Sequence, residues 1–546
     1  MLNKNKLLLL CILFIGIFFR LYGNNWDQGW HLHPDERFLT MVGIDIKLPT
    51  SLPQYLDQTT SPFNPVNKGH EFYVYGTFPV LLNKIIAQYM GNDTYDLFNL
   101  QGRVISGIAD FLIVLIIFKI LELIEKKLKL ASSIKYLGAF FYAIAVLPIQ
   151  LSHYFTVDTF LNLFCWLSFY YSIRFNVLTF KRSNVITDIC LSGLFLGLAV
   201  ASKISAIYMA PLIGVFIAVG LLRLYYQKST HRNKTISVIL SGVSFFVFFY
   251  LALRLGSPYY FETNNILDPS LSNIFMNNIG TLKSFEKPLG YFPPAIQWFS
   301  KSYDFPIKNI IFFGVGPLYF LISCFGAFLL AKKKNMYVLL SMIWILSFLI
   351  YQSFQFAKTM RYLILKVSFL ARKAIWTLLF LLVIFWPLAF MSIYTKEQSR
   401  VTASEWIYGN IPSRSTILTE YWDDPLPLMI QDPRSRNYVG KEVHIFDPDS
   451  QEKWSEVNSL LDSADYYIMS SNRAWGSIME VPQRYPTTSQ FYKSMLKNEK
   501  GFTLIKEFSS YPSLRYLGIP IDFPDQWAEE AFTVYDHPLV MIFKKN

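Results

Sequence analysis

The feature that most constrains this chain is a series of apolar runs, each about as long as a helix that crosses a membrane. A spanning helix requires roughly 17 to 25 predominantly apolar residues. The predicted spans are 7–21, 104–124, 136–151, 159–179, 186–202, 204–224, 235–255, 309–330, 336–354 and 374–394. We therefore expect a polytopic α-helical membrane protein with about 10 to 11 transmembrane helices.

The composition supports lipid as the surrounding solvent. The chain is 53% hydrophobic and 16% charged, whereas soluble domains average roughly 25% charged residues. The net charge of +12 could suggest nucleic acid, but the Lys and Arg residues fall in short clusters between apolar runs. Cytoplasmic loops collect such clusters. The four cysteines all lie inside apolar runs without metal-like spacing, so neither a disulfide framework nor a zinc site is predicted.

The basic clusters also give an orientation. With the N-terminus in the cytoplasm, the loops that hold Lys126, Lys181, Lys228 and Lys332 all fall inside, as the positive-inside rule requires. The alternate loops are then external, and two of them are long, at about 24–102 and 256–308. Those external loops are where we expect chemistry.

The composition changes after residue 394, which divides the chain into a transmembrane domain (1–394) and a soluble domain (395–546). The second part is polar and has short β-rich runs between helix-like stretches, which predicts a small α/β domain. The β-rich runs are 415–420, 443–446, 466–470, 502–508 and 539–543. The ten residues 362–371 are too short for a crossing. Three alternatives agree with the number of crossings: this segment is re-entrant, a helix has been lost here, or the C-terminal domain is cytoplasmic.

The first external loop contains an acidic pair, Asp35 and Glu36, just beyond the first helix. Glycosyl transfer to a hydroxyl requires a carboxylate that takes the acceptor proton, and either acid is placed to supply it. The alternative interpretation is that Pro34, Asp35 and Glu36 only begin a helix, because Pro and acids favour the first turn.

A second external loop carries His153 and Asp158, with Asp158 at the membrane boundary. Asp158 forms a polar pocket with the first acid pair or merely caps the next helix. Arg103, Lys203 and Arg361 fall on the same side. They hold a lipid phosphate together, or each only extends its charged end to the membrane surface.

The order of the motifs resembles that of the GT-C superfamily. They are His33-Pro34-Asp35-Glu36, Tyr75-Gly76-Thr77-Phe78-Pro79, Arg103-Val104-Ile105-Ser106, His153-Tyr154-Phe155-Thr156-Val157-Asp158 and Gly197-Leu198-Ala199-Val200-Ala201-Ser202-Lys203. The resemblance covers about residues 1–365. It is greatest to bacterial phospholipid-carrier-dependent glycosyltransferases related to the protein O-mannosyltransferases and aminoarabinose transferases, many of which have an external tail domain.

This resemblance implies a membrane glycosyltransferase that takes its sugar from a polyprenyl-phosphate donor, inverts the anomeric carbon and modifies a protein, glycan or lipid acceptor. Asp35 would be the base, and Glu36 would orient the acceptor or share that role. Asp158, with His153 beside it, would be the second-loop acid. Lys203 and Arg361, with Arg103, would lie near the donor phosphate. No cofactor is certain, no metal ligand is assigned, and Mg²⁺ or Mn²⁺ stays open.

A transporter or lipid flippase is the alternative function. That class is typified by inverted repeats and broken helices in matched halves, and the sequence shows neither. A transporter also has little use for a long first loop with an acidic pair. In an adhesion or sensor protein the spans would be only an anchor, and about ten spans are excessive for that purpose. The sequence does not specify the sugar or the acceptor.

Overall fold

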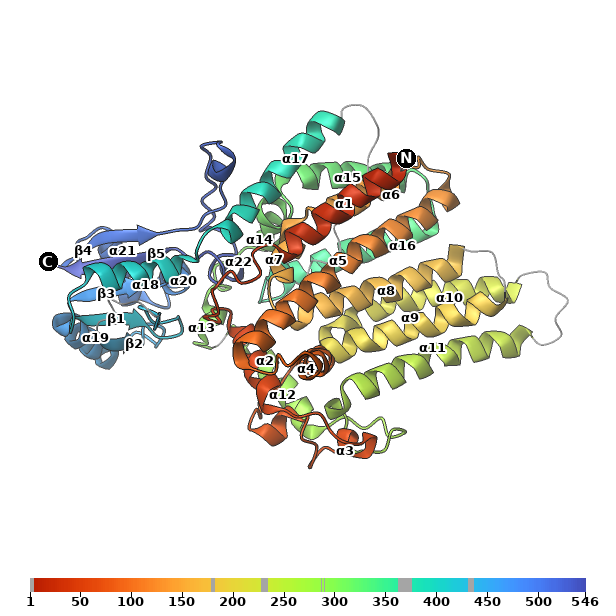
Figure 1. Cartoon of the computed structure of the whole chain (residues 1–546), viewed down its shortest axis with the longest axis horizontal. Coiled ribbons are helices and arrows are strands. Elements are labelled where there is room, and N and C mark those ends of the chain that lie inside the picture. Colours follow the sequence, from red (N-terminus) through yellow and green to blue (C-terminus); the bar gives the residue numbers. More distant parts are fainter. Residues whose placement is uncertain are drawn as a thin grey trace.

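The computed structural model describes residues 4–177, 182–226, 234–285, 287–288, 290–361, 376–430 and 437–546. The helices form one large bundle, and the sheet lies beyond one end of it, along the long axis of the molecule (Figure 1). This arrangement confirms the expected fold class, a helical membrane domain followed by a C-terminal α/β domain.

The long helices follow the predicted apolar runs closely. They are α1 (Lys4–Leu21), α5 (Tyr95–Leu128), α6 (Ile134–Ala143), α7 (Val146–Ser152), α8 (Val157–Val177), α9 (Arg182–Ser202), α10 (Ala210–Tyr226), α11 (Lys234–Gly256), α15 (Pro317–Ala331), α16 (Met336–Phe354) and α17 (Trp376–Met391). The structure differs most from the predicted spans at α5, which begins nine residues before 104.

By length and composition, five helices in the described residues can cross a membrane, or up to seven if each bent pair counts as one span. The expected number is higher because several apolar runs are broken or contain charge. The α6–α7 pair bends by 53°, and the segment 305–314 meets α15 at 109°. Helix α1 includes Lys4, Lys6 and Arg20, and α8 includes Asp158 and Arg174.

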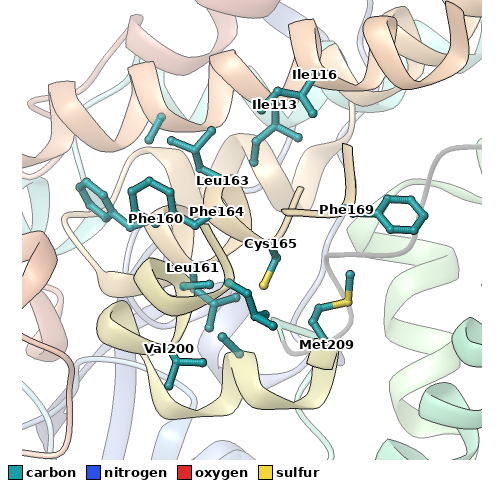
Figure 2. Close-up of a cluster of buried hydrophobic side chains, with 14 of the residues drawn as sticks. Ile113, Ile116, Phe160, Leu161, Leu163, Phe164, Cys165, Phe169, Val200 and Met209 are labelled. Atoms are coloured by element: carbon teal, nitrogen blue, oxygen red, sulfur yellow. The ribbon is translucent and has the colours of Figure 1, made fainter. Parts of the chain in front are cut away.

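The bundle is held together by apolar side chains that interlock between neighbouring helices. Figure 2 shows residues of α5, α8 and α9, with Met209 of the turn η2 (Ile204–Met209), meeting in one buried cluster. Cys165 lies in this cluster as a buried free thiol. The outer helices expose large apolar side chains such as Phe246 and Leu321. A surface of this kind suits contact with lipid.

One buried ion pair fixes α1 against the bundle. The Nε atom of Arg20 lies 2.6 Å from Oδ2 of Asp110 in α5, and the Tyr142 hydroxyl of α6 donates to Oδ1 of the same carboxylate at 2.6 Å. Arg20 also donates to the carbonyl of Ala143 at 2.8 Å. A buried ion pair is tolerated only when its remaining donors and acceptors are satisfied, and the Tyr142 and Ala143 contacts meet that condition.

The long loops contain short helices rather than extended coil. The first loop holds α2 (Pro34–Asp45), α3 (Leu52–Leu56), η1 (Pro65–Lys68) and α4 (Phe78–Met90). The later loop holds η3 (Pro258–Tyr260), α12 (Asn273–Phe285), α13 (Pro293–Ile296) and α14 (Phe305–Asn309), and the π-helical turn η4 (Ile310–Gly314) follows it.

The C-terminal domain is built on a five-stranded mixed sheet of order β2-β1-β3-β5-β4. Strand β1 pairs in parallel with β2 and β3, and β5 pairs antiparallel with β3 and β4. The strands are β1 (Thr416–Glu420), β2 (Val439–Val443), β3 (Tyr466–Met469), β4 (Phe502–Phe508) and β5 (Val540–Lys545). The helical elements are η6 (Ser392–Thr395), α18 (Ser399–Asn410), α19 (Gln451–Ser463), α20 (Arg473–Ile478), α21 (Pro486–Leu496), η7 (Arg515–Leu517) and α22 (Glu530–Thr533).

This domain packs on the same end of the bundle as the first loop. The Arg37 guanidinium lies 2.6 Å from the Asp424 carboxylate. Asp536 accepts hydrogen bonds from the Gln150 amide at 3.1 Å and from the Tyr394 hydroxyl at 3.0 Å. The C-terminal domain and the first loop therefore lie on one side of the bundle. The segment predicted to be re-entrant or shortened, 362–371, lies outside the described residues.

Candidate active site

Asp35 lies in the first turn of α2, on a helix start that its own sequence encodes. His33 is the N-cap, and its Nδ1 atom accepts from the Glu36 amide at 3.4 Å, while Pro34 occupies the first turn. Pro and acidic residues are favoured in a first turn, so the interpretation of this motif as a helix start is confirmed. It does not exclude chemistry, because the Asp35 side chain remains 31% exposed.

Arg361 faces the Asp35 side chain. Its Nη1 atom lies 3.3 Å from Asp35 Oδ2, and its side chain is 27% exposed. Burial alone would raise the pKa of Asp35, but the neighbouring positive charges, Arg361 foremost, hold that pKa below its ordinary value. Asp35 is therefore an ionised carboxylate at neutral pH. Two residues distant in sequence meet here because α2 and the segment after α16 converge.

Asp158 and Lys203 form a second ion pair close to the first. Lys203 Nζ donates to Asp158 Oδ1 at 2.8 Å, which joins the start of α8 to the turn between α9 and η2. The Lys203 charge also contributes to the lowered pKa of Asp35. The two pairs thus belong to one electrostatic site, which contains two carboxylates and two cationic side chains.

Tyr75 connects the two pairs. Burial, with the nearby Asp35 and Asp158 carboxylates, raises the pKa of Tyr75 well above its ordinary value. Its hydroxyl is therefore neutral and interacts with Asp35. The motif around it is held by close backbone contact: the Gly76 amide donates to the Ser202 carbonyl at 3.0 Å. A Cβ at Gly76 would lie 1.8 Å from the backbone oxygen of Ala201, so only glycine fits.

Glu36 and Arg103 belong to a separate, fully buried network. Arg103 donates to both oxygens of Glu36 at 2.8 and 2.9 Å and to both oxygens of Asp27 at 2.8 Å. The Phe155 amide donates to Glu36 at 2.5 Å, and the Trp26 ring lies 4.8 Å from the guanidinium. Arg103 brings the pKa of Asp27 to about 2 although burial opposes it. The structure therefore places Glu36 and Arg103 together in a buried network, whereas the Asp35–Arg361 pair is partly exposed.

His153 is buried in the same packed region. Its ring nitrogens lie 2.8 Å from the Ile149 carbonyl and 2.9 Å from the Tyr22 carbonyl, and its ring stacks on Tyr394. These contacts join α1, α7 and the start of the C-terminal domain. The structure does not bring His153 to the Asp35 and Asp158 side chains through any contact among the described residues.

Several residues of the C-terminal domain reach the site. The Tyr535 ring lies 4.2 Å from the His33 ring, and burial, with smaller effects from charges that include Asp35, raises the pKa of Tyr535 to about 12. Glu529 contacts the residues just before Arg361. Sequence analysis did not single out these residues, because nothing in the pattern of the domain indicates which of its loops faces the membrane part.

No group of three or more His, Cys, Asp or Glu side chains able to hold a metal ion occurs in the described part of the chain. Asp35 and Asp158 are the two carboxylates of the site, and each already faces a cationic side chain. A divalent cation bound here would compete with Arg361 and Lys203 for the same oxygens.

The profile of the family described as dolichyl-phosphate-mannose-protein mannosyltransferase matches residues 83–258, less than half of the chain. The matched part contains Asp158 and Lys203 but neither Asp35 nor Arg361. No curated protein matches the sequence significantly.

Three solved structures give the extent of the likeness. The Archaeoglobus fulgidus oligosaccharyltransferase, in complex with Zn and sulfate, has TM-score 0.50 and 12% identity and is matched over 98% of this chain and 88% of that one. The Saccharomyces cerevisiae Pmt1-Pmt2 complex bound to the sugar donor has TM-score 0.36 and 17% identity over 47% of this chain, which spans 33% of the yeast chain. ArnT of Cupriavidus metallidurans, bound to undecaprenyl phosphate, has TM-score 0.42 and 11% identity over 74% of this chain and 72% of that one.

The family match and the shared fold confirm the relationship that the motifs predict, to the GT-C superfamily of membrane glycosyltransferases. Within that superfamily, the sequence match is to the protein O-mannosyltransferases.

Proposed function

We propose that this protein transfers a sugar from a polyprenyl-phosphate carrier to an acceptor hydroxyl, with Asp35 as the general base. The observation that carries this proposal is that the partly exposed Asp35 faces Arg361, with the Asp158–Lys203 pair beside it. One ionised carboxylate and two cations are the groups that such a transfer requires. The match of residues 83–258 to the profile described as dolichyl-phosphate-mannose-protein mannosyltransferase supports the choice of a lipid-linked donor.

In the proposed step, Asp35 removes the proton of the acceptor hydroxyl as its oxygen attacks the anomeric carbon. The bond from that carbon to the phosphate oxygen breaks, and the electron pair leaves with the polyprenyl phosphate. Attack from the side opposite the leaving group inverts the anomeric centre. Lys203 and Arg361 stabilise the negative charge that grows on the departing phosphate.

The electrostatics of the site suit this order of events. Arg361 lowers the pKa of Asp35, so the carboxylate is ionised but is a weak base. A bound phosphate adds a second anion beside Arg361 and Lys203, which offsets their effect on Asp35 and raises its proton affinity. Donor binding therefore prepares the base.

We assign phosphate neutralisation to Lys203 and Arg361 rather than to Mg²⁺ or Mn²⁺, because these cations already face the two carboxylates of the site. Assays with added Mg²⁺ or Mn²⁺ and with EDTA test this assignment. Rates that depend on the added metal would contradict it.

The donor class is tested directly with purified protein and a panel of radiolabelled polyprenyl-phosphate sugars, with and without peptide, glycan and lipid acceptors. The proposal predicts that one donor is consumed and that its sugar appears on an acceptor hydroxyl with inverted configuration. Transport of an intact lipid-linked sugar across a vesicle membrane, without transfer, would instead favour a flippase.

We further propose that the site and the C-terminal domain face the outside of a bacterial plasma membrane. Gln28, Lys283 and Lys333 are exposed positions in the described chain. In a background without the native cysteines, Gln28→Cys and Lys283→Cys should react in intact cells with a thiol reagent that does not cross membranes, and Lys333→Cys should not. Labelling only at Lys333 would place the site in the cytoplasm.

A further inference from the structure

The residues just before Arg361 are held by a carboxylate from the C-terminal domain. Glu529 accepts a hydrogen bond from the Met360 amide at 2.6 Å and another from the Thr359 hydroxyl. The Glu529 amide in turn donates to Oδ1 of Asn309 at 2.7 Å. Glu529, Thr359 and Met360 are all buried. One side chain therefore joins the C-terminal domain to the chain segment that carries Arg361.

Holding the backbone at Met360 limits where the Arg361 guanidinium can lie. Arg361 follows directly in sequence and extends its side chain to within 3.3 Å of Asp35. A flexible arginine on an unfixed segment would lose conformational entropy each time it met an anion. Fixing the preceding backbone reduces that loss, so Glu529 acts on the site without touching it.

The neighbouring acid, Glu530, gives an internal comparison. Its carboxylate lies 2.6 Å from Arg473 and accepts from the Gln297 amide at 3.0 Å. The Gln297 contact also joins the domain to a loop of the membrane part, and Glu530 is also buried. Among the described residues, Glu530 forms no hydrogen bond or ion pair with residues 359–361, so we expect it to stabilise only the interface.

We propose that Glu529 is a positioning residue for Arg361, so that the C-terminal domain completes the site that binds the donor phosphate. This inference rests on the proposed function, because it assigns the donor phosphate to Arg361. It makes the domain a part of the active site rather than an appended module.

The charge environment of Glu529 adds a consequence for pH. Burial raises the pKa of Glu529 to about 7, although the hydrogen bonds from Thr359 and Met360 and the charge of Arg361 oppose the rise. The charged groups that face it are Arg361 and Glu530, and α14 presents the neutral Asn309. Both oxygens accept hydrogen bonds, which suits the ionised form. As the pH falls through about 7, protonation should loosen the segment and raise KM for the donor.

The test compares Glu529→Gln with Glu530→Gln in the full chain. Glutamine keeps the size of the side chain but turns an acceptor oxygen into a donor group. For Glu529→Gln we expect kcat/KM for a polyprenyl-phosphate sugar to fall about 10-fold or more, through donor KM, with acceptor KM unchanged. Glu530→Gln should lower the thermal stability about as much as Glu529→Gln does, but it should leave donor KM at the wild-type value.

Arg361→Ala separates this inference from the proposed function. If Glu529 acts through Arg361, the variant that combines Glu529→Gln with Arg361→Ala should have the same donor KM as Arg361→Ala alone. Additive losses, or equal effects of the two glutamine variants on donor KM, would overturn the positioning role while leaving Arg361 as a phosphate ligand. An Arg361→Ala protein with wild-type donor KM would instead overturn the proposed donor site.

The wild-type protein provides a measurement that does not depend on the folding of a variant. Its donor KM should rise as the pH is lowered from 8 to 6, because the pKa of about 7 for Glu529 lies within that range. The sugar-linked phosphate is a diester and does not titrate in that range. A donor KM that stays constant over this range would overturn the inference.

Discussion

Asp35 and Glu36 are adjacent in sequence, yet they lie in opposite environments. The Glu36 side chain is fully buried and, with Asp27, surrounds the equally buried Arg103 at hydrogen-bond distances of 2.8 to 2.9 Å. The Asp35 side chain is 31% exposed and faces Arg361 at a looser 3.3 Å. The buried network has little capacity to accept a ligand, whereas the half-exposed pair can exchange one partner for another.

This difference shows how the first turn of one helix can place a buried structural acid, Glu36, next to a partly exposed acid, Asp35. Successive residues in a first helical turn point in directions about 100° apart, as 3.6 residues per turn require. In α2 the Glu36 side chain therefore points into the bundle, whereas the preceding Asp35 side chain stays partly exposed. Glu36 holds α2 against α5 through Arg103, and that contact fixes the position of Asp35, the proposed base.

The largest effect on stability is expected when Arg103 is replaced. Arg103→Ala leaves the Asp27 and Glu36 carboxylates buried without their cation, and losing one partner of a buried pair costs about 3 to 5 kcal/mol. Thermal unfolding in detergent should show a strongly lowered midpoint or little folded protein. Arg361→Ala is the matched control, because its half-exposed pair should leave the midpoint nearly unchanged. Equal unfolding midpoints for the two variants would contradict the claim that the Arg103 network stabilises the fold more than the Asp35–Arg361 pair does.

A smaller effect is expected at Lys203, on donor binding. If its ammonium neutralises the donor phosphate, Lys203→Ala should weaken donor affinity by about 10- to 100-fold, the range for a hydrogen bond to a charged group. Acceptor affinity should change little. Donor titrations with the correctly folded variant measure this effect. Under the alternative interpretation, in which Lys203 only reaches the membrane surface, affinity and rate would both be unchanged.

Much of the fold is predictable because the signals are long and local. The run 336–354 matches α16 at both ends, and the runs 416–420, 466–469 and 502–508 lie within the predicted β-rich segments. Strand β2 was predicted several residues too late, because Val439–Val443 contains Gly440, Lys441 and Glu442 at an exposed sheet edge. The bends at 143–146 and 314–317 were missed, since apolar composition does not report where a helix changes direction.

The site was less predictable, because it depends on contacts between distant segments. Of the residues that the sequence indicated for the site, the structure brings four together: Asp35, Asp158, Lys203 and Arg361. The sequence also indicated Arg103 and Glu36, but spacing cannot show that Asp27, an acid with no motif of its own, would complete a buried network with them. The role of Glu529 requires the tertiary position of the C-terminal domain, which no local pattern encodes.

The central claim is that Asp35 performs the chemistry while Glu36 maintains the structure, and one paired measurement tests it. Asp35→Asn and Glu36→Gln are purified side by side, and sugar transfer, donor binding and thermal unfolding are measured for each. We expect Asp35→Asn to lose about two to four orders of magnitude in turnover, with donor binding and the unfolding midpoint retained, and Glu36→Gln to lower the midpoint. Near-wild-type turnover in Asp35→Asn, beside a folded but inactive Glu36→Gln, would contradict the account.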